Sequence, residues 1–331
     1  MEGQKKRSVQ TLGGIPVGFG IVSLNKKKEK ICGDYYTIIT DPDSDSTVMV
    51  LSDGLGSGVK ANILATLTAE MLSIMIARKV NIRTAVKAVA DTLPVCSVRN
   101  LAYATFTVMV AEENEICLLQ YDNPDVILLR NGKNVEYYRD ILMFGEKEIH
   151  QSYFQFREGD MLIFMSDGVT NAGMGKTTYA GWGREEVVGF CEQHYRDGMS
   201  AQEMSSAIAD AGLALNLDET DDDLTVLTVA AMKKNIVNIM VGPPADREDD
   251  RSYFETFFQK EGMRVVCGGT TAKLVADYLQ TEVTGLPDSG TEEVPAMSEI
   301  KGIDLVTEGL LTLEKLMDYY EDFQEDRTYF N

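Results

Sequence analysis

The stretch "LSDGLGSG" at residues 51–58 closes an apolar run, "TVMVLS", with an aspartate and a glycine. The chain repeats this arrangement at 161–168, where "MLIFMS" leads into Asp167 and Gly168. Apolar, β-branched runs of this length predict strands, so Asp53 and Asp167 each follow the end of a strand. Asp-Gly is also an ordinary turn dipeptide, and one such pair alone would indicate no more than a turn.

Two further acidic positions also lie at predicted strand ends. Asp34 begins the strand in "CGDYYTIIT", and Asp222 and Asp223 in "ETDDDLTVLTV" directly precede another. Strand ends that face each other from two sheets would gather these acids into a cleft, where unpaired carboxylates are costly unless cations bind them. Because Mg²⁺ and Mn²⁺ prefer oxygen ligands, the four positions together predict a site for such ions. The glycine at position 54 permits a tight turn that brings a backbone carbonyl close to an ion.

Predicted strands dominate the first 235 residues. Apolar alternation predicts them over 15–23, 35–40, 47–52, 104–111, 115–121, 126–130, 161–165 and 224–231. Helical spacing predicts helices over 59–79, 82–93, 185–195 and 201–215. In the first helix we expect one apolar stripe to pack into the core, formed by Ile63, Leu64, Leu67, Met71 and Met75. This order of elements favours an α+β sandwich of packed layers over an alternating parallel sheet.

The pattern changes after residue 235, so we predict a domain over 1–235 and a second, small α/β domain over 236–331. Strands and helices alternate there, which predicts a parallel sheet. The expected order is strand 236–241, helix 249–260, strand 263–267, helix 270–279, strand 303–307 and helix 308–321. Residues 281–299, rich in Pro, Gly and acids, are predicted to form an exposed loop.

Composition limits the classes of function. The 331 residues carry a formal net charge of −21, which would repel nucleic acid because such binding rests on phosphate neutralisation by Lys and Arg. The continuous apolar runs are of strand length, the first ten residues show no secretory signal, and we expect a cytoplasmic protein with no membrane partner. The five cysteines include no C-x-x-C pair, which favours reduced thiols over a zinc site or disulfides.

Four motifs in this order resemble a known family. "GDYY" (33–36), "LSDGLGSG" (51–58), "MLIFMSDGVTNA" (161–172) and "DDLTVLTV" (222–229) are similar to motifs of the metal-dependent protein serine/threonine phosphatases of the phosphatase 2C class, in particular the SpoIIE-like bacterial branch. The resemblance covers approximately residues 10–232 and includes "DNPDVILLRNGK" at 122–133. It implies an α-β-β-α four-layer sandwich with two Mn²⁺ or Mg²⁺ ions, and hydrolysis of phosphoserine or phosphothreonine in a partner protein by a water that bridges the ions.

The resemblance also implies roles for individual residues. Asp53 would bridge both ions, Gly54 would supply a carbonyl oxygen, and Asp34 would bind one ion directly or through water. Asp167 and Asp222 would complete the coordination of the other ion. Asp222 is the first residue of the "DDLT" motif and is therefore preferred over Asp223, which occupies the neighbouring position, although the alignment leaves the choice open.

The chain departs from the wider class in two places. No histidine follows Gly54, and the two histidines, His150 and His194, lie away from the motifs. The phosphate-binding arginine of eukaryotic relatives has no clear match, and Lys30 is only close to Asp34 in sequence. The glycine-rich segment 171–184, "NAGMGKTTYAGWGR", is open to two interpretations: a flap whose Trp182 contacts a partner protein, or a surface loop anchored by one half-buried aromatic.

Residues 236–331 lie outside the resemblance. If their strands are parallel, the loops that follow them meet at one edge, where open α/β sheets bind ligands. Gly268, Gly269, Thr270 and Thr271 would then form either an anion site at a helix start or a plain capped turn. We therefore leave open a regulatory domain with a small-molecule ligand and a dimerisation domain that forms a homodimer.

Two classes of function remain after these arguments. The first is the phosphatase, whose substrate in the SpoIIE-like branch would be a phosphorylated regulator of the anti-anti-sigma type. The second is a catalytically weak signalling scaffold or ligand-sensing module with the same fold. All of the aspartates in the motifs are present, which favours the enzyme.

Overall fold

The computed structural model describes residues 11–41, 46–92, 104–144, 147–232, 236–243, 250–291, 295–307, 309, 314–315 and 317–319. The chain divides into two compact units, Met1–Lys233 and Lys234–Asn331, a division two residues before the predicted boundary.

The first unit contains two six-stranded antiparallel sheets. One has the strand order β1-β2-β12-β11-β7-β8. Its strands are β1 (Thr11–Leu12), β2 (Ile15–Leu24), β7 (Ile127–Arg130), β8 (Lys133–Asn134), β11 (Asp160–Met165) and β12 (Leu224–Ala231). The other has the order β3-β4-β5-β6-β10-β9. Its strands are β3 (Asp34–Asp41), β4 (Ser46–Gly54), β5 (Ala104–Glu112), β6 (Glu115–Tyr121), β9 (Asp140–Phe144) and β10 (Lys147–Gln155).

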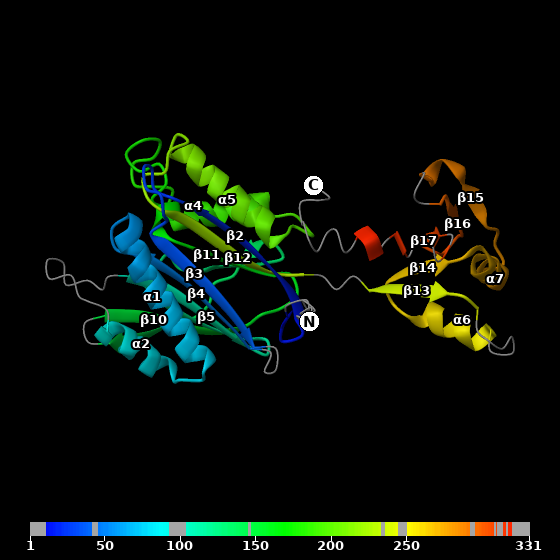
Figure 1. Ribbon diagram of the computed structural model, residues 1–331, viewed down its shortest axis with the longest axis horizontal. Coiled ribbons are helices and arrows are strands. Elements are labelled where there is room, and N and C mark those ends of the chain that lie inside the picture. Colours follow the sequence, from blue (N-terminus) through cyan, green and yellow to red (C-terminus); the bar gives the residue numbers. More distant parts are fainter. Residues whose placement is uncertain are drawn as a thin grey trace, which may run out of the picture. The chain divides into compact units, whose positions relative to one another are not determined.

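The two sheets pack face to face between helices, as Figure 1 shows, and this confirms the predicted four-layer α-β-β-α sandwich. Strand alternation builds the layers, because successive side chains of a strand point to opposite faces. In β4, Met49 and Leu51 face the other sheet, whereas Val48 and Val50 face the helices. The helices on the β3–β9 sheet are α1 (Gly58–Ala77) and α2 (Ile82–Thr92), and those on the other sheet are α4 (Arg184–His194) and α5 (Ala201–Leu215).

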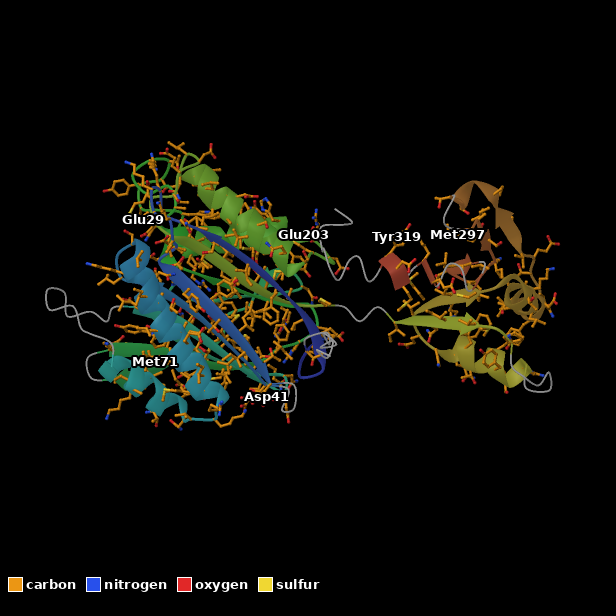
Figure 2. All side chains as sticks on the ribbon, viewed as in Figure 1. Glu29, Asp41, Met71, Glu203, Met297 and Tyr319 are labelled. Carbon is orange, nitrogen blue, oxygen red and sulfur yellow. The ribbon has the colours of Figure 1, made fainter. Side chains whose placement is uncertain are left out.

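Helix α1 packs on its sheet with a face that only partly matches the predicted one. Its buried residues include Ala61, Ala65 and Ala69 toward its start and Leu72 and Ile76 toward its end. Ile63 and Leu67, from the predicted core stripe, are 51% and 47% exposed. The stripe prediction is therefore wrong for these two residues, whereas Met71 and Met75 of the same stripe are partly buried and pack against the core. Figure 2 labels Met71 on this helix, where it is half-buried.

By length and composition alone, α1 is also apolar enough to cross a membrane, and it is the one such helix among the described residues. The helix nevertheless contains no continuous apolar run of that length, because Lys60, Asn62 and Glu70 interrupt it. The core helix of a globular domain passes the same test, and one face of α1 is packed against the sheet.

The second unit contains a five-stranded sheet of order β13-β14-β17-β16-β15. The predicted parallel alternation is confirmed for β13 (Val237–Val241), β14 (Met263–Cys267) and β17 (Leu305–Thr307), with α6 (Asp250–Gln259) and α7 (Gly269–Leu279) between them in sequence. The prediction of a loop over 281–299 is wrong in part. This stretch contains β15 (Thr284–Leu286), a 3₁₀ turn (Pro287–Ser289) and β16 (Met297–Glu299), which form an antiparallel extension of the sheet. Most of the predicted helix 308–321 lies outside the described residues.

Candidate metal centre

Asp34 and Asp53 are direct partners across two neighbouring antiparallel strands. Asp34 is the first residue of β3, and the register places it opposite Asp53 near the end of β4. Directly opposite residues of such a pair point to the same face, with Cβ atoms about 4.5–5.5 Å apart. Both belong to the face that also carries Leu51 and Tyr36, so they point toward the second sheet. Two of the predicted ligands are therefore brought together by strand register alone.

The second sheet contributes the facing residues. Strand β11 ends at Met165, and Asp167 follows as the first residue of the short helix α3 (Asp167–Thr170). Asn171 donates a hydrogen bond from Nδ2 to Asp167 Oδ2 at 3.2 Å, which fixes the orientation of that carboxylate. The backbone N–H of Ser166 donates to the carbonyl of Thr225 at 3.0 Å and thereby aligns the ends of β11 and β12.

Asp222 and Asp223 occupy different environments just before β12. Asp222 is 44% exposed, and its Oδ1 accepts a hydrogen bond from the backbone N–H of Asp223 at 3.0 Å. Asp223 is 4% exposed, and its Oδ1 accepts from the backbone N–H of Lys26 at 2.9 Å. The electrostatic neighbours also differ, since Asp222 acts on Asp53 and Asp167, whereas Asp223 acts on Asp34. The acids thus form two adjacent groups, one around Asp53 and one around Asp34.

Three glycines permit this close approach of the two sheets and of α1. A Cβ on Gly54 would lie 2.0 Å from the carbonyl oxygen of Ala61, and a Cβ on Gly168 would lie 2.0 Å from that of Asp223. A Cβ on Gly33 would lie 2.6 Å from Oδ2 of Asp223. In each Asp-Gly pair, a neighbouring backbone carbonyl therefore leaves no room for any residue other than glycine. From the sequence, Gly54 was explained only by the approach of its own carbonyl to an ion.

Burial and mutual repulsion raise the pKa values of these carboxyls. Burial, followed by the nearby charges of Asp34 and Asp167, raises the pKa of Asp53 to about 9. Burial is also the main cause that raises the pKa of Asp34 to about 7. The pKa of Asp167 is raised by burial and by the charge of Asp222. Without a cation, the group therefore holds protons that free aspartates would release near neutral pH.

The donor atoms fit a hard divalent cation. Both carboxylate oxygens of Asp34 and Oδ2 of Asp223 are buried and have no hydrogen-bond partner. A buried carboxylate oxygen without a hydrogen-bond partner costs free energy. A hard divalent cation is the partner that such oxygens bind best. Among the described residues, no three acidic, histidine or cysteine side chains converge as a ready metal cage. The acids act on one another at one end of the sandwich without forming such a cage.

One basic residue of this region was not recognised from the sequence. Nζ of Lys26 lies 3.5 Å from Oδ1 of Asp222. Within the described ranges, Lys26 and not Lys30 is the basic residue that forms an ion pair with these acids. Its signal was weak, because it lies in the run "KKKEK" at 26–30, which is more simply a solvated stretch. Figure 2 labels Glu29 in this same loop, at the end of the first unit opposite to Asp41 of β3.

The glycine-rich segment 171–184 is anchored rather than free. Trp182 packs edge-on against Phe190 with ring centroids 5.2 Å apart, which favours the anchored-loop interpretation. Lys176 forms an ion pair with Asp221 at 2.7 Å and so links the segment to the loop that carries Asp222. Tyr179, at 99% exposure, is the aromatic that the segment presents to solvent.

The two histidines contact residues outside the group of acids. His194 stacks on Phe190, and His150 lies 3.8 Å from Asp125. The four described cysteines are free thiols, three of them buried, while Cys96 lies outside the described residues.

In the second unit, Gly268 is the N-cap of α7 with a positive φ of 99°. The predicted meeting of loops at one sheet edge is observed for β14 and β17, because Gly268 donates to the carbonyl of Thr307 at 2.8 Å. Gly269 and Thr270 are exposed, but Thr271 is buried in the packing of α7. Binding of an anion by Gly268–Thr271 stays a prediction.

Comparisons with known proteins support the fold of the first unit. Residues 43–231 match the family described as stage II sporulation protein E (SpoIIE). No curated protein matches the chain. Among solved structures, the phosphatase 2C domain of SpoIIE from Bacillus subtilis with a fragment of its regulatory domain is 19% identical, with a TM-score of 0.53. That match covers 65% of this chain but only 63% of the Bacillus chain, which is less than two thirds of its length.

Two further structures give the same result. The phosphatase domain of Bacillus subtilis SpoIIE in a crystal form without domain swapping is 17% identical over 69% of this chain and 97% of that chain, with a TM-score of 0.51. The RsbU and RsbW domains of a Mycobacterium tuberculosis protein are 16% identical over 74% and 69%, with a TM-score of 0.52. Because the family match spans more than half of the 331 residues, the chain belongs to the SpoIIE family and has the phosphatase 2C fold.

Proposed function

We propose that the protein is a metal-dependent phosphatase that hydrolyses phosphoserine or phosphothreonine in a partner protein. One observation carries the proposal: five carboxylates from two facing sheets meet at one end of the sandwich, and three of their buried oxygens have no partner. Such an arrangement is costly for the folded protein unless divalent cations bind there.

Asp53, Asp167 and Asp222 would hold one part of a Mn²⁺ or Mg²⁺ centre, with the carbonyl of Gly54 beside them, and Asp34 would hold the other part. Asp223 borders Asp34 and is the alternative to Asp222 as a direct ligand. A bound pair of divalent cations supplies an activated water and neutralises phosphate charge. Asn171 would keep Asp167 oriented, because its amide already donates to that carboxylate.

The side chains beside the acids support a water nucleophile rather than a covalent intermediate. The hydroxyl of Ser166 is fully buried, and it already accepts a hydrogen bond from the backbone N–H of Thr225 at 3.0 Å. Burial, together with the charge of Asp34, raises the pKa of the Cys32 thiol to about 12, so the reactive thiolate is not formed at neutral pH. Neither group is available to attack a phosphate.

The substrate that we propose is a phosphorylated regulator of the anti-anti-sigma type, which the SpoIIE-like resemblance implies. The free thiols of the described cysteines support a reducing compartment, and we keep the cytoplasm as the proposed location. The second unit would then act as a regulatory or dimerisation domain.

Hydrolysis of an aryl phosphate in the presence of Mn²⁺ tests the proposal. We expect activity that EDTA abolishes, and a loss of at least about a hundredfold in Asp53→Asn and in Asp167→Asn, because each removes a charge that binds the cations. Asp210→Asn is the matched control, since Asp210 is an exposed aspartate of α5 outside the group of acids.

Equal activity in wild type, Asp53→Asn and Asp167→Asn would contradict the mechanism. A wild-type protein that binds Mn²⁺ but hydrolyses neither the aryl phosphate nor phosphoserine peptides would instead favour the scaffold function.

A further inference from the structure

Lys26 is placed to act on both members of the acidic pair before β12. Its backbone N–H donates to Oδ1 of Asp223 at 2.9 Å, and its ammonium lies 3.5 Å from Oδ1 of Asp222. The first contact does not depend on the side chain. The second is a loose ion pair between groups that are 35% and 44% exposed, so it is weak and easily exchanged.

The neighbouring lysines have other partners. Lys27 pairs with Glu219, and Lys176 pairs with Asp221 at 2.7 Å. Three successive acids of this loop, Glu219, Asp221 and Asp222, therefore each have one lysine. Within the described residues, Lys26 is the one lysine or arginine in an ion pair with any of the five acids of the candidate centre.

Charge balance gives Lys26 a role once cations bind. Five ionised carboxylates carry one more negative charge than two divalent cations neutralise, and this excess would repel a phosphate dianion. The ammonium of Lys26 cancels the excess. A cation that takes Asp222 as a ligand would displace the ammonium, which remains tethered beside the site by the backbone contact to Asp223. A lysine ammonium is a flexible point charge well suited to a phosphate oxygen.

We propose that Lys26 is a phosphate-positioning residue: its ammonium competes with the divalent cation for Asp222 and, once displaced, binds an oxygen of the substrate phosphate. This inference rests on the proposed phosphatase function.

The test compares Lys26→Met, which keeps the length of the side chain but removes the charge, with Lys26→Arg, which keeps the charge. Lys27→Met is the matched control, because it removes the same charge from the next residue of the same loop. All three variants should keep the wild-type melting temperature within a few degrees, since the backbone contacts of residues 26 and 27 remain.

Calorimetric titration of Mn²⁺ into the metal-free full chain is the first readout. Lys26→Met should bind Mn²⁺ about two- to fivefold more tightly than wild type, because no ammonium competes for Asp222. At saturating Mn²⁺, Lys26→Met should raise KM for a phosphoserine peptide about tenfold and change kcat less than threefold. Lys26→Arg should restore KM, and Lys27→Met should match wild type in both readouts.

The inference is overturned if Lys26→Met matches Lys27→Met in both readouts, or if Lys26→Arg fails to restore KM. A protein that binds Mn²⁺ without hydrolysing the peptide would refute the proposed function separately. In that case, calorimetric binding of O-phosphoserine to the manganese-saturated protein decides the role of Lys26, with about tenfold weaker binding expected in Lys26→Met. Absence of Mn²⁺ binding in wild type would overturn both proposals.

Discussion

Asp34 and Asp53 face each other on paired strands. The repulsion between their two carboxylates costs free energy unless a cation binds there or the carboxylates take up protons. In the metal-free protein, protons perform this role, because burial and the neighbouring charges raise the pKa of Asp34 to about 7 and that of Asp53 to about 9. In an unfolded chain both would titrate near the ordinary value for aspartate, about 4. The folded state therefore retains protons that the unfolded state has already released.

This difference predicts how the stability of the metal-free protein depends on pH. Between pH 6 and pH 8 the free energy of unfolding should fall as pH rises, by at most about 1.4 kcal/mol per pH unit for each proton retained. Asp53→Asn should flatten this slope, and Asp210→Asn should leave it unchanged. Urea denaturation in EDTA at pH 6, 7 and 8 measures the slope, and equal slopes in wild type and Asp53→Asn would contradict the pKa assignment.

The acids of the site could be predicted from the sequence because each lies next to a strong strand signal, as Asp53 does after "TVMVLS". Lys26 and Gly33 could not be predicted in the same way. Lys26 contacts Asp222 and Asp223 across almost 200 residues of sequence, and Gly33 is needed only because Asp223 Oδ2 passes close to it. Contacts of this kind depend on how the two sheets pack, which no local pattern reports.

At the scale of elements, the position of α1 against the end of β4 links helix packing to the metal centre. Gly54, the last residue of β4, touches the backbone of α1 at Ala61. Any side chain at position 54 would push the helix away or shift Asp53.

Gly54→Ala should therefore destabilise the protein by about 1–3 kcal/mol through overpacking and weaken Mn²⁺ binding about tenfold or more. Gly189→Ala, in the interior of α4, meets no atom within 4 Å and should stabilise the protein by up to about 1 kcal/mol, because alanine favours a helix. Chemical denaturation and calorimetry of both variants measure these effects. A Gly54→Ala protein as stable as wild type, with unchanged Mn²⁺ affinity, would show that α1 accommodates the methyl group at no cost.

Elements with a strong period were predicted within one or two residues, and β6, β12, β14 and α5 were predicted with the bounds that the structure has. Strands β9 and β10 were missed because their exposed positions carry Ile141, Met143 and Tyr153, which removes the alternation of apolar and polar residues. The buried face of α1 was misassigned in part for a related reason. Hydrophobicity alone favoured Ile63 and Leu67, whereas the structure buries Ala61 and Ala65 in the same part of the helix.

At the scale of the whole molecule, the two compact units predict that the first one folds alone. A fragment of residues 1–235 should be soluble, unfold cooperatively and bind Mn²⁺, because the two sheets and the acids are complete by Ala231. Circular dichroism and calorimetry of the fragment beside the full chain measure this. An unfolded fragment from a stable full chain would show that the division is wrong, and altered phosphatase activity in a folded fragment would support a regulatory second unit.

The pairing of β2 with β12 has a consequence for biosynthesis. Eight residue pairs, from Leu24–Leu224 to Val17–Ala231, join segments that are synthesised about 200 residues apart. While the ribosome adds these residues, β2 has no partner from β12, and the second sheet that Asp34 and Asp53 face is incomplete. At about 5–20 residues per second, this interval lasts roughly 10–40 s. The nascent chain therefore exposes a strand edge until Ala231 has left the ribosome, and a cation can find its complete set of ligands only after that moment.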